Sequence, residues 1–332
     1  MAHRIHIENG RASMMYVGPP PWHGHGQALD HPATAEEAIS AASLDWEVEK
    51  QPLYAGGEGV AYRVDGKFAI VPKHKWGTEE CPVFGIVGTD YTPLQNRDAF
   101  RFFDPIVGEG AAIYHTAGAL GDGERIWILV KLPGSIKVTG QDISEKYLLL
   151  SNSHDGESSV QIKFTPIRVV CWNTLTMALS KGPTIRAAHT RDVHERLKHA
   201  RLTLRLINDH YAKIEETFKR MAATQMTAAR LKEYFTTVFP DPSDSNDKQG
   251  QRRAVQNRDR AVHLFENGRG NRLSGVRGTL WAAYNGVAEF VDYRSTRRTQ
   301  EEQLESIWFG DGYLLKARAF EIAKGRLDVW PT

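Results

Sequence analysis

The spacing of apolar side chains changes along the chain, and this change predicts two kinds of structure. Between residues 53 and 166, apolar and polar positions mostly alternate, which is the two-residue period of half-buried strands. Gly121-Asp122-Gly123 lies between two such runs and is typical of a hairpin turn. From Val169 onward the apolar period becomes helical. The pattern therefore predicts an α+β fold, with an antiparallel sheet core and a flanking helix, followed by a helical C-terminal subdomain.

Two short helices are expected before and within the sheet region. Thr34 can cap a helix that ends near Ala42, because acidic residues follow in the first turn. Asn96 can cap the second helix, in which Pro105 marks a kink or a stop. Residues 10–35 are otherwise expected to be irregular.

The clearest periodic signal is a run of apolar residues spaced alternately four and three apart. Its members are Val193, Leu197, Ala200, Leu204, Ile207, Tyr211, Ile214, Phe218 and Met221. Such a seam, held for about four heptads, predicts a helix roughly 45 Å long. The seam can pack within one chain as a helical hairpin or between chains as a coiled coil. The expectation for the protein is a homo-oligomer.

The expected domain organisation has three parts. Residues 1–52 form an N-terminal arm and helix, residues 53–182 the sheet-based core, and residues 183–332 a helical, basic C-terminal region. A polar linker at residues 240–250, rich in Asp, Ser and Pro, is expected as a loop within the last region.

The net charge of +2 hides an asymmetry between the two halves of the chain. Residues 1–180 carry 15 Lys and Arg against 21 Asp and Glu, whereas residues 181–332 carry 27 against 19. A basic half favours a polyanion partner, or a contact with an acidic surface in the same or another chain. Ordinary solvated helix faces would give the same composition.

Nucleic-acid binding is the function that the basic half favours. The predicted phosphate-binding residues are Arg252, Arg253, Arg258, Arg260, Arg269, Arg272 and Arg277. Aromatic residues on or near the β segments can stack unpaired bases: Tyr62, Trp76, Tyr91, Tyr114 and Trp127. Tyr114 and Trp127 can equally be a cross-strand pair in the core. The order of helix, hairpin, strands and helix also resembles phage single-strand annealing proteins at the level of the fold.

Several short segments, in order along most of the chain, resemble those of one known family. They are Pro21-Trp22-His23-Gly24, Gly88-Thr89-Asp90-Tyr91-Thr92-Pro93-Leu94-Gln95-Asn96, Thr116-Ala117-Gly118, Ser153-His154-Asp155-Gly156, Thr165-Pro166-Ile167-Arg168-Val169-Val170-Cys171-Trp172-Asn173-Thr174-Leu175, Gly278-Thr279-Leu280-Trp281-Ala282-Ala283-Tyr284-Asn285 and Trp308-Phe309-Gly310. The family is that of phage- and plasmid-like proteins, an uncharacterised domain of unknown function. The resemblance implies a mobile-element gene, and it carries over no catalytic residue.

Enzymatic motifs are weak in this sequence. The histidines His3, His6, His23, His25 and His31 could hold a metal, but no carboxylate or cysteine stands at a ligand spacing beside them. Ser153-His154-Asp155 has the residue types of a hydrolytic triad, but adjacent residues cannot converge as a triad must. Neither a phosphate-binding Gly-Lys-Ser/Thr loop nor a dinucleotide fingerprint is present. We therefore expect no catalytic residue, no metal and no cofactor.

The expected setting is the host cytoplasm, without a membrane contact. Cys81 and Cys171 are too few for a disulfide scaffold, and the chain has no apolar run of about 18 residues. The sequence leaves three classes of function open. The first is nonspecific nucleic-acid binding with single-stranded DNA favoured, the second is a protein-interaction factor acting on a host or phage partner, and the third is an unrecognised hydrolase.

Overall fold

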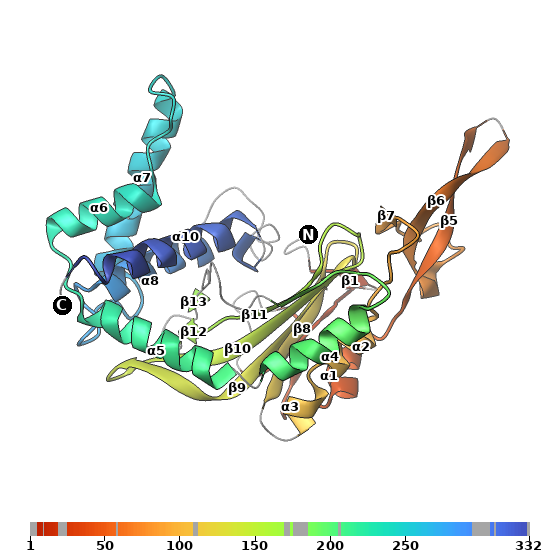
Figure 1. Ribbon diagram of the computed structural model, residues 1–332, viewed down its shortest axis with the longest axis horizontal. Coiled ribbons are helices and arrows are strands. Elements are labelled where there is room, and N and C mark those ends of the chain that lie inside the picture. Colours follow the sequence, from red (N-terminus) through yellow and green to blue (C-terminus); the bar gives the residue numbers. More distant parts are fainter. Residues whose placement is uncertain are drawn as a thin grey trace. The chain divides into compact units, whose positions relative to one another are not determined.

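The computed structural model describes residues 5–8, 10–18, 25–57, 59–108, 112–168, 173–174, 185–204, 207–293, 306–308 and 310–330, without the side chains of 108, 168, 173–174, 199–204 and 207–208. The chain forms two compact units, and each is described on its own (Figure 1). Unit 1 comprises Met1–Pro133, Leu148–Lys163 and Thr184–Arg205, and unit 2 comprises Gly134–Tyr147, Phe164–Pro183 and Leu206–Thr332. Helices and antiparallel sheets are both present, which confirms the α+β class. The three-part division expected from the sequence stays a prediction.

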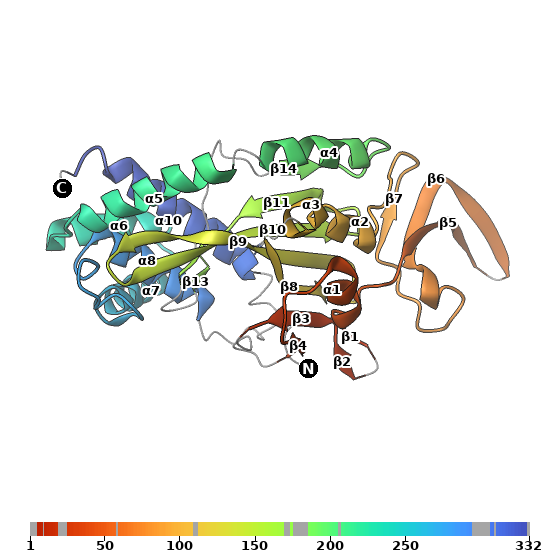
Figure 2. The same ribbon diagram turned by 90° about the horizontal axis from the view of Figure 1, so that it is seen from below.

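Unit 1 is built on a sheet whose strands lie in the order β14, β11, β10, β9, β8, β3, β4. Their bounds are β3 Met14–Val17, β4 Gln27–Leu29, β8 Ile113–Leu120, β9 Arg125–Thr139, β10 Asp142–Ser153, β11 Val160–Phe164 and β14 Ile185–Ala187 (Figure 2). Strands β9, β10 and β11 contribute residues to both units. Strand β3 is antiparallel to β8 and parallel to β4. The expectation that residues 10–35 are irregular is therefore wrong at β3 and β4. A run of four apolar or aromatic residues in β3 is too short to display an alternating period.

Helices α1 (Ala35–Ala41) and α2 (Asn96–Arg101) pack on each other in unit 1, and α1 also packs on β3 and β8. The predicted start of α1 is confirmed, because Thr34 caps it and forms a reciprocal pair of hydrogen bonds with Glu37. The predicted cap by Asn96 is wrong. Gln95 occupies the cap position, and Asn96 is buried inside the first turn. Two further helices follow in unit 1, α3 (Asp104–Gly108) and α4 (Val193–Leu204).

Tyr114 and Trp127 are both buried, but they do not form a cross-strand pair. Tyr114 is opposite Val130 and Trp127 is opposite Gly118, with a register shift between Tyr114 and Thr116. Val130 and Trp127 are three residues apart on β9, so they point to opposite faces of the sheet. Tyr114 points towards α2, where its hydroxyl donates to the carbonyl of Phe100 at 2.8 Å. Trp127 therefore lies on the other face, above Gly118, where a side chain would collide with the indole.

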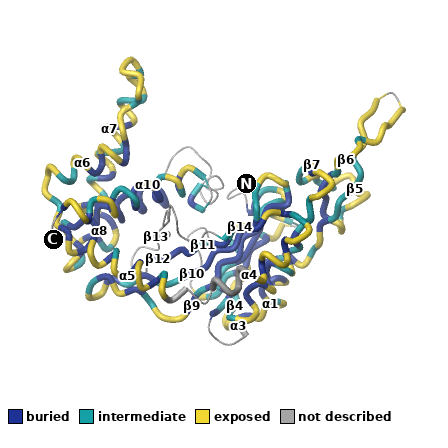
Figure 3. Tube along the Cα trace, viewed as in Figure 1, coloured by how far each residue is buried: buried dark blue, intermediate teal, exposed yellow. Residues whose placement is uncertain are grey.

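A second sheet of unit 1 contains β5 (Val48–Gly57), β6 (Val60–Pro72) and β7 (Gly85–Val87), and a 3-10 helix at Lys73–Lys75 follows β6. Its small core consists of Val48, Ile70 and Val87 with Trp46, Phe68, Phe84 and Tyr91 packed around them. The far ends of β5 and β6 form an exposed arm, defined here as residues 54–57 and 59–63 (Figures 1 and 3). Separate from this sheet, β1 (Ile7–Glu8) pairs with β2 (Arg11–Ala12).

Unit 2 is mainly helical, as expected for this part of the chain. Its helices are α5 Ile207–Ala223, α6 Ala228–Val238, α7 Lys248–Asn267, α8 Leu280–Asp292 and α10 Asp311–Arg326; β12 (Ile167–Arg168) and β13 (Asn173–Thr174) extend the hairpin at residues 134–147. Every residue of α8 is buried, and α5, α7 and α10 pack against it. Trp281 in α8 donates to Asp142 at 2.6 Å, which joins the central helix to the hairpin.

Two helical predictions differ from the observed structure. The seam residues fall on two helices, α4 and α5, which belong to different units. Val193, Leu197, Tyr211, Ile214, Phe218 and Met221 are buried, and the side chains at 200, 204 and 207 lie outside the described residues. The helix expected from Val169 is wrong at Asn173–Thr174, which pairs as strand β13, and the rest of that segment after residue 168 lies outside the described residues. The homo-oligomer stays a prediction.

Candidate nucleic-acid interface

The predicted phosphate-binding arginines lie on α7 and on the turn that follows it in unit 2 (Figure 1). Helix α7 is amphipathic: Ala254, Ala261 and Phe265 are buried, and α7 packs against α8. Asp247 caps its first turn by accepting from the backbone N–H of Gly250 at 2.8 Å. The buried stripe fixes the rotation of the helix, so that its opposite side faces solvent.

Six of the seven arginines are exposed, and Arg258 is not. Arg258 forms an ion pair with Asp241 at 2.6 Å and donates to the carbonyl of Phe239 at 3.3 Å. Its charge is already paired, which makes it a poorer phosphate ligand than the other six. Arg258 instead ties the segment before α7 to the helix.

Arg252, Arg253 and Arg260 share one side of α7. At 3.6 residues per turn they fall within a sector of about 100°. Arg252 and Arg253 have no ion-pair partner among the described residues, and Arg260 lies 5.8 Å from the centre of the Phe290 ring. Residues 248–278 carry eight Lys and Arg against two Asp and Glu, so this segment has a net charge of +6. Side chains of this sector can reach a polyanion without moving α7.

The turn after α7 is held in place by buried polar contacts. Asn271 is buried and donates to the carbonyls of Leu264 and Ala282 at 2.9 and 3.1 Å. The backbone N–H of Arg269 donates to Glu289 at 2.9 Å, and its guanidinium lies 4.8 Å from the Tyr293 ring centre. The turn therefore presents its exposed arginines, Arg269, Arg272 and Arg277, from a fixed backbone.

Two of the five aromatic residues proposed for base stacking are accessible. Tyr62 is 69% exposed and Trp76 is 52% exposed. Tyr91 is partly buried and stacks on His189, with 4.9 Å between ring centroids, and its hydroxyl donates to the carbonyl of Ser153. Tyr114 and Trp127 are buried. Only Tyr62 and Trp76 in this set can meet a base without rearrangement.

His154 is a core residue rather than a member of a triad. It is fully buried, and its Nε2 lies 2.9 Å from the amide oxygen of Asn96. Its ring packs against Trp46 and Phe84, with centroid distances of 5.6 and 6.2 Å. Burial, reinforced by nearby His189, lowers the pKa of His154 to about 3, so the ring is neutral at pH 7.

Two of the segments that carry the family resemblance meet around this histidine. Asn96 donates to the carbonyl of Leu44 at 3.1 Å while its amide oxygen faces His154, and Asn152 donates to the carbonyl of Leu94 at 3.1 Å. Gln95 makes two 2.9 Å hydrogen bonds to the backbone of Val48. These amides satisfy buried backbone groups, which gives the shared residues a structural role.

The neutral state of His154 predicts that unit 1 loses stability as the pH falls. The unfolded chain binds a proton near pH 6.5, whereas the folded chain binds it only near pH 3. The free energy of unfolding should therefore fall from about pH 6.5 downwards by roughly 1 kcal/mol per pH unit. Urea denaturation between about pH 7 and pH 5 measures this slope. His154→Gln should flatten it relative to the parent protein, and an equal slope in both would contradict the prediction.

The N-terminal histidines do not converge on a metal site within the described residues, where no group of three or more His, Cys, Asp or Glu is positioned to hold an ion. His31 lies 2.8 Å from Asp30, which raises the pKa of the imidazole. Burial lowers the pKa of His6. His3 and His23 lie outside the described residues.

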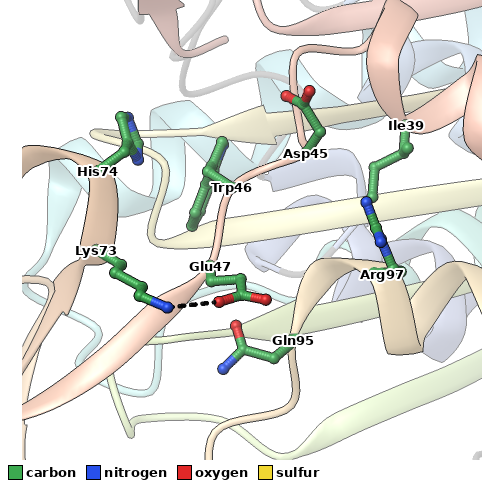
Figure 4. Close-up of a pocket in the computed structure, with 8 residues that line it drawn as sticks. All are labelled: Ile39, Asp45, Trp46, Glu47, Lys73, His74, Gln95 and Arg97. Atoms are coloured by element: carbon green, nitrogen blue, oxygen red, sulfur yellow. Dashed lines mark hydrogen bonds and ion pairs between the residues drawn. The ribbon is translucent and has the colours of Figure 1, made fainter.

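A pocket of 390 Å³ opens in unit 1 beside the start of β5 (Figure 4). Its lining residues are Ile39, Asp45, Trp46, Glu47, Lys73, His74, Gln95 and Arg97. Lys73 and Glu47 form an ion pair at 3.3 Å, and Gln95 is held by the backbone of Val48. Charges of both signs are mixed in this lining, so it does not favour one class of charged ligand.

Comparison with known proteins identifies a family but no activity. Among the described residues, no helix combines the length and apolar character that crossing a bilayer requires. Searches of curated proteins and of solved structures find no match. A family model described as "Domain of unknown function (DUF932)" matches residues 83–308. This match spans more than half of the chain, and it includes Asn96, His154, α7 and α8. The chain therefore belongs to the DUF932 family, a family of unknown function.

Proposed function

We propose that this chain is a non-enzymatic, nonspecific nucleic-acid-binding protein of a phage or plasmid, acting in the host cytoplasm. The observation that carries the proposal is the exposed arginine sector of α7 formed by Arg252, Arg253 and Arg260. The resemblance described above supports the mobile-element setting. The neutral, buried state of His154 favours a binding protein over a hydrolase.

The proposed mode of binding is contact with the phosphate backbone. Arginine guanidinium groups match the geometry of phosphate oxygens, and each neutralised phosphate releases counterions. Contacts of this kind carry no sequence information, so binding is nonspecific. Tyr62 and Trp76 are accessible for stacking on unpaired bases, which favours single strands.

Changing Arg252, Arg253 and Arg260 to Ala should weaken binding and flatten its dependence on salt. For single strands the logarithm of the affinity changes by about −0.7 per contacted phosphate for each logarithmic unit of salt. Loss of three contacts should therefore reduce the slope by roughly two units. Fluorescence anisotropy with a single-stranded oligonucleotide of mixed sequence, at several salt concentrations, measures this slope.

The matched control removes three positive charges from a different surface. Arg191, Arg196 and Lys198 are exposed on and just before α4, and their replacement by Ala changes the net charge equally. This control should keep most of the parent slope. Equal slopes in all three proteins, or no binding of the parent at low salt, would refute the proposal.

The exposed arm of β5 and β6 favours a second candidate function, binding to a protein partner. Tyr54, Val60 and Tyr62 are 58%, 51% and 69% exposed on this arm. Exposed large apolar side chains of this kind mark interaction surfaces. A pull-down from host lysate, with and without nuclease, separates the two candidates. Partners that are lost after nuclease treatment support nucleic-acid binding, and partners that stay support the protein interface.

A further inference from the structure

A second group of cations lies in unit 1, on three strands that are distant in sequence. Gln161 and Lys163 are two residues apart on β11, so their side chains point to the same face of the sheet. Arg186 on β14 is the direct cross-strand partner of Gln161. Opposed residues have Cβ atoms about 5 Å apart, and diagonal neighbours about 7–8 Å. Gln161, Lys163 and Arg186 therefore form a compact set of donors.

Arg125 on β9 lies close enough to lower the pKa of Lys163, and we include it in this group. The buried residues of β11 and β14 lie on the opposite face of these two strands. Val160, Ile162 and Ala187 are buried and occupy the opposite face of β11 and β14. Lys163 and Arg125 are partly buried, whereas Arg186 is exposed. The group is thus shielded on its inner side and open to solvent at Arg186.

The charges in this group repel one another. Burial and the two guanidinium groups, of Arg186 and Arg125, lower the pKa of Lys163 to about 8. The carboxylate of Asp155 lies 3.9 Å from the guanidinium of Arg125. In the folded protein the protonated form of Lys163 is therefore less favourable than it is for a lysine in water. An anion between the three cations would reverse this effect, because an opposite charge favours the protonated lysine.

We propose that Lys163, Arg186, Arg125 and Gln161 form a binding site for a phosphate-class oxyanion in unit 1. Two guanidinium groups and an ammonium supply charge-assisted donors to phosphate oxygens, and the amide of Gln161 supplies a neutral one. The oxyanion comes from a free phosphate compound or from a nucleic-acid backbone. The site does not depend on the arginines of α7, which belong to unit 2.

The reactivity of Lys163 towards an amine-acylating reagent provides the test. Near pH 8 about half of the lysine is unprotonated and reactive when its pKa is about 8. A bound oxyanion that raises the pKa by about one unit should reduce labelling roughly fivefold. Labelling of the full chain is measured by peptide mass spectrometry with pyrophosphate, with a mixed-sequence single-stranded oligonucleotide, and with sodium chloride at equal ionic strength.

Two controls keep the result specific. Lys67 is exposed on β6 in the same unit and should be labelled equally in all conditions. Arg186→Gln removes an exposed charge without disturbing the core; it should lower the basal labelling of Lys163 and abolish most of the protection. Circular dichroism establishes that this variant is folded.

The labelling results show whether the site exists and which kind of oxyanion it binds. Protection by pyrophosphate supports a site for free phosphate compounds, and protection by the oligonucleotide alone supports a backbone site. No protection by either, or equal protection of Lys67, would overturn the proposal. Repeating the pyrophosphate experiment in the Arg252, Arg253 and Arg260 variant separates the two sites, because protection of Lys163 should persist there.

Discussion

Replacement of Trp281 by Ala is expected to destabilise unit 2 by about 3–5 kcal/mol. The indole is fully buried in α8 and packs on Phe218 with a centroid distance of 4.4 Å. Its N–H donates to the buried carboxylate of Asp142 at 2.6 Å. The change therefore creates a large cavity and also takes a donor away from a buried carboxylate. Urea denaturation, followed by far-ultraviolet circular dichroism, measures the loss as a shift of the unit 2 transition.

Two further substitutions separate these contributions. Trp281→Phe keeps most of the buried ring but removes the N–H, so it should cost about 1–3 kcal/mol. Trp76→Ala is the matched control, because Trp76 is 52% exposed and its removal should change stability by less than about 0.5 kcal/mol. If Trp281→Ala unfolds at the same urea concentration as Trp76→Ala, the assigned packing of α8 is wrong.

Lys316→Met is expected to have a similarly large effect, again in unit 2. Lys316 in α10 is fully buried and pairs with Asp292 of α8 at 2.7 Å. Burial lowers the pKa of Lys316, and the carboxylate of Asp292 opposes that effect. Removing the lysine leaves a buried carboxylate without this partner, which should cost about 3–5 kcal/mol. Thermal and urea denaturation of the single variant measure the cost.

The double variant Lys316→Met with Asp292→Leu should recover much of the lost stability, because both buried charges are then removed. An exposed ion pair provides the comparison. Lys219 and Glu215 lie 2.6 Å apart on α5, with side chains 53% and 29% exposed, and Lys219→Met should cost less than about 0.5 kcal/mol. A double variant as unstable as the sum of its two single variants would mean that Lys316 and Asp292 act independently.

Local signals in the sequence were sufficient for parts of the fold. The capping pair of Thr34 and Glu37 fixes where α1 begins, and the turn at Gly121-Asp122-Gly123 lies between β8 and β9, as expected. The loop expected at residues 240–250 is present up to Asp247, although α7 already begins at Lys248. These features depend on neighbouring residues, which is why spacing alone predicts them.

Features that depend on distant partners could not be predicted in this way. The sequence predicts Asn96 as a helix cap, but its amide instead donates to the carbonyl of Leu44 and faces His154. Tyr114 and Trp127 look like neighbours on a hairpin, and a register shift sends them to opposite faces. Asn173–Thr174 carries a helical spacing but pairs as a strand. In each case a tertiary contact outweighs the local preference.

The two candidate binding sites also differ in how far the sequence predicts them. The arginines of α7 are close in sequence, so charge counting finds them, although the pairing of Arg258 with Asp241 becomes visible only in the structure. The group at Lys163, Arg186 and Arg125 is dispersed over three strands and gives no sequence motif. Within β11, the alternation of polar Gln161 and Lys163 with apolar neighbours indicates only that these two side chains share one face of a strand.

The bond between Trp281 and Asp142 also sets an order of events during synthesis. Its two partners are 139 residues apart, and at 5–20 residues per second the ribosome needs roughly 7 to 28 s to make the chain between them. All segments of unit 1 are complete once Arg205 has emerged, whereas the hairpin at residues 134–147 still lacks α8. Unit 1 can therefore fold first, whereas Asp142 in the hairpin has to remain without its Trp281 partner until α8 has been synthesised.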